Sequence, residues 1–132
     1  MATGTAGTAA RDYNMQMIHY LRKTITYADG GTTVTVGTIP AGALLVKPIS
    51  GVAVNVAFNG DTSNILDIGP SDNTDLWMTD GSLASIAFVP LDEAVSNLVS
   101  SDTVVQCAVV STASASAGSA EIVIAYIPDN DG

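Results

Sequence analysis

The stretch that decides the fold is Ile39–Val46, IPAGALLV. An alternating run, Val34-Thr35-Val36, precedes it, and a longer apolar run, Val52–Phe58, follows it. Both runs are typical of strands, in which successive side chains point to opposite faces. Proline has no N–H to donate to a strand ladder, so Pro40 is expected at the end of a strand and not within one. We therefore expect a corner, built as a type I turn with Pro40 in its second position and Gly42 in its fourth.

The residues before this corner predict a first pair of strands. Residues 13–27 give an imperfect strand pattern that is cleanest at Thr24–Tyr27, and residues 32–38 alternate strictly between apolar and polar. The turn residues Ala28–Gly31 separate the two runs. Two alternating runs joined by a glycine-containing turn indicate a β-hairpin.

The residues after the corner predict further short strands. Pro48 and Gly51 are expected to bend or bulge the long strand, which ends at the turn Asn59-Gly60. Residues 91–99 could hold a single helical turn. The other expected strands are Asn64–Ile68, Asp75–Thr79, Leu83–Val89, Thr103–Ser111 and Ala120–Ile127. Eight or nine strands with turn signals about every 8–12 residues indicate an all-β antiparallel sandwich or closed barrel.

One domain is expected for 132 residues. Residues 1–12 are mainly Ala, Gly and Thr, which predicts a flexible N-terminal arm before a β domain at 13–132. Residues 13–23 have two interpretations: the first strand of the sandwich, or a continuation of the arm that packs on a neighbouring subunit. The second interpretation assigns that contact to three apolar anchors and three basic guides: Met15, Met17, Tyr20, Arg11, Arg22 and Lys23.

Charge is scarce and unevenly placed. Charged residues make up 13% of the chain, whereas Ala, Gly, Ser and Thr account for 56 of the 132 residues. A surface of small, weakly polar side chains suits close contact with other protein chains. The four basic residues lie within the first 47 positions, and 11 of the 13 acidic residues follow them. We expect no direct nucleic-acid partner, because phosphate binding needs clustered Lys and Arg. No apolar run approaches the length of a membrane span, so no membrane partner is expected either.

Few residues could carry catalysis or hold a metal. His19, the only histidine, lies in the first strand pattern and is interpreted as a surface or packing residue. Cys107, the only cysteine, lies in an apolar strand and is expected to be buried and inert. Asp72–Asp80 is the densest group of oxygen ligands, but its spacing does not match an EF-hand, and a solvated acidic loop is the preferred interpretation. We expect no enzyme, no cofactor and no metal site.

Trp77 is a candidate interface residue. It lies between Leu76 and Met78 in a short predicted strand, and it is expected to anchor either the core or a subunit interface. Stacking on a sugar is the alternative role for this side chain.

Residues 24–75, TITYADGGTTVTVGTIPAGALLVKPISGVAVNVAFNGDTSNILDIGPSDNTD, resemble small β-sandwich virion proteins of tailed bacteriophages. Such chains pair a strand ending in a V-x-x-I/L-P-A-G-A corner with a long strand ending in A-F-N-G, followed by a short strand ending in glycine. The corresponding residues here are Val36–Ala43, Ala57–Gly60 and Thr62–Gly69, and the apolar last strand, Ala117–Ile127, also fits. The resemblance covers residues 24–127 and implies trimers of jelly-roll type.

The resemblance implies a bacteriophage virion structural protein, specifically a decoration or cement protein that binds the head lattice and stabilises it. The implied partners are further copies of the chain in a homotrimer and the major capsid protein. The implied location is the surface of the phage head, after synthesis in the host cytoplasm. Two alternatives stay open: a receptor- or glycan-binding module of a head or tail fibre, and a small carbohydrate-active enzyme. The enzyme would need two carboxylates about 5–9.5 Å apart in one groove.

Overall fold

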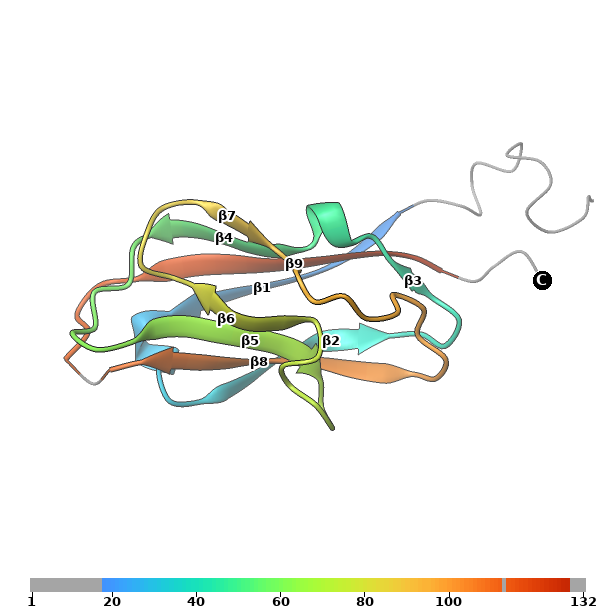
Figure 1. The fold of residues 1–132 in the computed structure, drawn as a ribbon, viewed down its shortest axis with the longest axis horizontal. Helices are drawn as coiled ribbons and strands as arrows, with labels where there is room; N and C mark the ends of the chain where they lie inside the picture. The colour runs from blue at the N-terminus through green and yellow to red at the C-terminus, as the bar shows by residue number, and fades with distance from the viewer. Residues whose placement is uncertain (1–17, 113, 129–132) are drawn as a thin grey trace, which may run out of the picture.

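The structure, a computed structural model, describes residues 18–112 and 114–128, and within them the chain forms nine strands and two 3-10 helices. The strands form two antiparallel sheets that enclose one hydrophobic core (Figure 1). The all-β sandwich predicted from the sequence is confirmed.

Sheet A has the strand order β1-β9-β4-β7, and the short strand β3 pairs with β9 beyond the end of β4. Its strands are β1 (His19–Thr26), β3 (Leu44–Leu45), β4 (Gly51–Val56), β7 (Phe88–Pro90) and β9 (Ser119–Ile127). The pairing of β1 with β9 is unbroken from His19 opposite Tyr126 to Thr26 opposite Ser119. This register fixes which side chains of β1 face the core.

Sheet B has the strand order β2-β8-β5-β6. Its strands are β2 (Thr33–Ile39), β5 (Asn64–Pro70), β6 (Met78–Ser82) and β8 (Thr103–Ser111), and the two 3-10 helices of the chain are η1 (Tyr27–Asp29) and η2 (Lys47–Ile49). In each sheet an early strand lies beside a late one, β1 beside β9 and β2 beside β8. This interleaved connectivity is that of a jelly roll.

The core follows directly from period-two alternation. In β8, Val105, Cys107 and Val109 are buried while the residues between them are not. In β9, Ile122 and Ile124 point to the same core from the other sheet. Burying these side chains contributes about 25 cal/mol per Å² of apolar surface removed from water, the main favourable term for such a fold.

The corner at Pro40 is present, but its turn is not the one predicted. Ala43 N–H donates to the carbonyl oxygen of Pro40 at 3.3 Å, so Pro40 is the first residue of the turn and Gly42 the third. Gly42 has φ +85°, the left-handed backbone that the third residue of a type II turn requires. The prediction of a type I turn was wrong because Pro40, directly after β2, takes the first position of the turn and not the second, which moves Gly42 to the third.

A second segment holds this corner in place. Gly42 N–H donates to the Val99 carbonyl at 2.6 Å, and Val99 N–H donates back to Ala43 at 2.8 Å. Ala41 N–H donates to the Asp102 carboxylate at 2.9 Å. Residues 97–102, which contain no helix, therefore act as a strap across the crossing from sheet B to sheet A, and the expected helical turn at 91–99 is absent.

The predicted hairpin between residues 13–27 and 32–38 was also wrong. β1 lies in sheet A and β2 in sheet B, and η1 carries the chain from one to the other. The Asp29 carboxylate accepts the backbone N–H of Thr26 at 2.9 Å, which fixes this crossing. Leu21 lies against Gly37 across the gap, where a Cβ would come within 2.9 Å of the leucine side chain. Alternation identified both strands but could not say which strand each would pair with.

Three further boundaries differ from expectation. η2 takes the place of the bend or bulge expected at Pro48, and it splits the long strand into β3 and β4. β6 continues through Asp80-Gly81, which the sequence indicated as a turn, with Asp80 at φ +54°. β7 occupies only the end of the run predicted at Leu83–Val89. These short strands obtain their bounds from hydrogen-bonding partners and not from local pattern.

Ser50 closes the gap that η2 leaves beside β9. Its side chain is fully buried, and its hydroxyl donates to the Val46 carbonyl at 2.8 Å while accepting the Ala125 N–H at 2.9 Å. The hydroxyl thereby replaces a strand partner for Ala125, whose N–H would otherwise be buried without an acceptor.

Ser50→Ala is expected to lower the free energy of unfolding by about 1–3 kcal/mol, because it orphans a buried backbone donor. Urea unfolding followed by fluorescence measures the change. Ser85→Ala, at an exposed position before β7, is the control and should stay within about 0.5 kcal/mol of the parent. Equal effects of both substitutions would contradict this role for Ser50.

Cys107 is fully buried, as expected, and burial raises the pKa of its thiol to about 12. We expect a thiol reagent at pH 8 to leave the folded protein unlabelled and to label the unfolded chain, whose thiol pKa is about 8.5. The pKa of the Cys107 thiol is higher in the folded protein than in the unfolded chain. The contribution of the buried thiol to the free energy of unfolding is therefore complete below pH 8.5, and it is lost as the pH rises towards 12. Urea unfolding from pH 8 to 11 should show a steeper loss of stability for the parent than for Cys107→Ala, which lacks the thiol.

Candidate interaction surface

The outer face of sheet A is apolar over β4 and β7. Thr26, Ser119 and Val56 lie opposite one another in the register, and Val56 is exposed beside the smaller two. Phe88 lies opposite Ala53 on the same side and is also exposed. Ile86, which precedes β7, is 72% exposed. Large apolar side chains exposed together in this way mark interaction sites on soluble proteins.

A second apolar group crosses the end of sheet A where β1 begins and β9 ends (Figure 1). Leu44 lies opposite Ile127 on one side and opposite Leu98 on the other. The β1–β9 register places Ile18, one residue before β1, opposite Ile127. Residues directly opposite in antiparallel strands share a face. We call Leu98, Leu44, Ile127 and Ile18 the terminal row; they are 58%, 39%, 36% and 41% exposed.

This face carries little net charge. Arg22 donates from Nε to Glu121 at 3.0 Å and from Nη2 at 2.6 Å, a two-pronged pair between β1 and β9. The hydrogen bond from Arg22 lowers the pKa of Glu121, so the pair stays ionised and self-neutralising at neutral pH. A partner for this face therefore needs apolar surface more than charge.

The outer face of sheet B is different in character. Its exposed β2 positions are occupied by Thr33, Thr35 and Thr38. The loop from Ser71 to Trp77 folds over Gly69, where a Cβ would come within 2.2 Å of the Asn73 carbonyl oxygen. That loop brings Asp72 and Asp75 to the sheet B side, where Asp67 accepts the backbone N–H of Asp80 at 2.7 Å. The outer face of sheet B thus combines acidic and hydroxyl side chains with the exposed Val104 and Val110, whereas the large exposed side chains of sheet A are mainly apolar.

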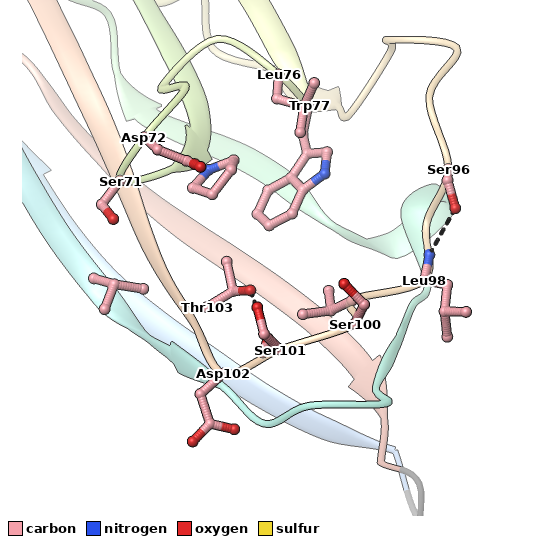
Figure 2. Close-up of a pocket in the computed structure, with 13 residues that line it drawn as sticks. Ser71, Asp72, Leu76, Trp77, Ser96, Leu98, Ser100, Ser101, Asp102 and Thr103 are labelled. Carbon is pink, nitrogen blue, oxygen red and sulfur yellow. Dashed lines mark hydrogen bonds between the residues drawn. The ribbon is translucent and has the colours of Figure 1, made fainter.

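A side pocket of about 400 Å³ lies between that loop and residues 96–104 (Figure 2). The Trp77 ring forms one wall, facing Ser100, Ser101 and Thr103. The Asp102 carboxylate points away from the hollow, towards the corner that it caps. Trp77 is 3% exposed, so its ring belongs to the core and offers almost no free face to a ligand.

The predicted interface residues that the structure describes lie either in β1 or in the core. Arg11, Met15 and Met17 lie outside the described residues. Tyr20, Arg22 and Lys23 belong to β1, so residues 19–23 form part of the sandwich and not a detached arm. Tyr20 is exposed on the outer face, whereas Lys23 lies opposite the buried Ile122 on the core side of this edge strand. Trp77 takes the core position that was one of its two expected roles.

Sequence reasoning missed the residues that make the outer face of sheet A apolar. Phe88, Ile86 and Leu98 fall in or beside segments whose strand bounds were predicted incorrectly. Without the correct register, their alternation could not reveal that they point outward. The only signal available was an excess of apolar residues over what a small core requires.

The described residues were compared with two further kinds of site, a metal site and a membrane-spanning helix. Residues 18–112 and 114–128 contain no group of three or more His, Cys, Asp or Glu placed to hold a metal ion. In the same residues no helix has the length and apolar character to cross a membrane.

No protein-family model matches the sequence, and a search of curated proteins finds no match. Two solved structures share the fold. A chain in the capsid asymmetric unit of cyanophage Pam1 superposes with a TM-score of 0.68 and 14% identity, over 97% of this chain and 96% of that one. A chain in the acid-stable capsid structure of Helicobacter pylori bacteriophage KHP30 gives 0.67 and 14%, over 84% and 87%. The expected similarity to phage virion proteins is confirmed at the level of the fold.

Proposed function

We propose that the chain is a structural protein of a bacteriophage virion and that it acts on the head surface as a decoration or cement protein. The observation that carries this proposal is the match over nearly the full length of both chains to a subunit of the Pam1 capsid asymmetric unit. A subunit of the same size and fold in a capsid makes a role in the shell the simplest one for this chain.

The apolar outer face of sheet A supplies a physical reason for such a role. Ile86 and Phe88 expose large side chains on a face whose one described ion pair, Arg22–Glu121, is self-neutralising. Burying such a face on the major capsid protein or on further copies of the chain removes apolar surface from water without stranding a charge. The acidic face of sheet B would then point to solvent and keep the particle soluble.

The two alternative functions have less support. A glycan-binding module would use the side pocket, but sugar stacking requires an exposed aromatic face, and Trp77 is 3% exposed. A glycosidase requires two free carboxylates in one groove. Of the two in the pocket lining, Asp102 is already engaged with the Ala41 N–H.

Copy number tests the proposed function directly. Quantitative mass spectrometry of particles from the virus that encodes the chain should find hundreds of copies, and an electron-microscopy map should place them on the head. A few copies to some dozens at a fibre would favour the glycan-binding alternative, and absence from the particle would overturn the proposal.

Phe88→Asp should weaken binding to particles that lack the chain by about tenfold or more, because a hot-spot side chain contributes about 2 kcal/mol. Val110→Asp is the matched control, since it adds the same charge at an exposed apolar position of sheet B. A pelleting assay with unfolding curves for both variants measures the difference. Equal loss from both substitutions, or loss from Val110→Asp alone, would contradict attachment through sheet A.

A further inference from the structure

We propose that the terminal row is the acceptor site for an N-terminal segment, residues 13–17, of a second copy of this chain. This proposal rests on the proposed function, because it names the contact that joins subunits within the assembly. It assigns a site to four aliphatic side chains that are aligned across one end of sheet A and stay 36–58% exposed.

The dimensions of the row fit a short extended segment. From Ile18 to Leu98 the row crosses three inter-strand steps of about 4.8 Å each, about 14 Å in all. Five extended residues span about 17 Å. Tyr13, Met15 and Met17 recur at every second position, so an extended segment would present all three on one side. Methionine suits such a surface because its flexible thioether adapts to aliphatic neighbours.

In every copy, residue 17 at the end of this segment is bonded to Ile18 of that copy's own terminal row. Ile18, the first described residue, is itself one end of the row, and Ile127, near the end of β9, lies next to it. β1 starts and β9 stops at this end of the sandwich (Figure 1), so residues 18–112 and 114–128 supply no further strand there.

The β1 register favours the row of a second copy over the chain's own. In that register a strand continued upstream would place Met17 opposite Pro128, which lacks an N–H, and would run past the end of β9. Odd positions of β1, such as Leu21 and Ile25, face the core, so Met15 and Met17 would continue that side beyond the end of β1, outside the core cluster formed by the described residues. To reach its own row the chain would have to reverse at Gln16-Met17-Ile18, which contains no turn-forming residue.

Disulfide trapping between two variants that each add one cysteine to the parent tests the proposal. Met15→Cys is co-expressed with a tagged Leu98→Cys, and the complex is oxidised and run on a non-reducing denaturing gel. We expect a mixed disulfide-linked dimer that joins one tagged and one untagged chain. The buried Cys107 does not compete. Met15→Cys with tagged Val110→Cys, on the outer face of sheet B, is the control and should give at least tenfold less of the mixed dimer.

Two outcomes of the trapping experiment would overturn the proposal. No mixed dimer above the control is one; the other is a disulfide found only within single chains of the double variant Met15→Cys/Leu98→Cys, which would mean that the segment covers its own row. Light scattering gives independent evidence. Deletion of residues 1–12 should leave the oligomer intact, whereas deletion of residues 1–17 should give a folded monomer. An oligomer that is unchanged after the longer deletion would also overturn the proposal. Failure of these tests with normal copy number in particles would remove this contact and leave the proposed function standing.

Discussion

The crossing at Ile39–Val46 is the constraint on which the arrangement of both sheets depends. β2 ends at Ile39 in sheet B, and Leu44 begins β3 in sheet A, so four residues must carry the chain across the core. Pro40 stops the first strand because it has no N–H to pair, and Gly42 supplies the left-handed backbone that the reversal needs. The Asp102 carboxylate and the Val99 backbone hold the crossing from the other side. Residues 97–102 are thereby fixed as well, immediately before β8.

The same crossing explains why one end of sheet A remains apolar on its outside. The strap that holds the corner brings Leu98 beside Leu44, and Leu44 pairs with Ile127. Each of these residues takes part in strand pairing, but its side chain stays 36–58% exposed in the sandwich. The proposed contact with a second copy of the chain would cover these side chains.

Alternation of apolar and polar residues predicted the strands that bury one face completely. It failed for strands whose first and last residues are set by pairing with another strand. The run Thr103–Ser111 was predicted with its true bounds because Val105, Cys107 and Val109 alternate strictly. The hairpin was wrong because alternation does not encode which strand is the neighbour. Interface residues are harder to predict: the role of Arg22 as a guide for a partner stays a prediction, and in the structure Arg22 pairs with Glu121, 99 positions away in the same chain. Such contacts depend on the topology, which no local window contains.

The edges of the sandwich indicate how copies of the chain can and cannot meet. β7 has three residues and ends in Pro90, β6 contains a register shift and the left-handed Asp80, and β2 contains a bulge around Val36. β1 is long and regular, but Lys23 lies on its core-facing side, where an added strand would close over the ammonium group. Short strands, bulges, proline and inward-pointing charge all oppose edge-to-edge pairing. Because these features protect the four edges, the proposed association would use the apolar outer face of sheet A and the end of the sandwich, surfaces that a closed, symmetric assembly could bury.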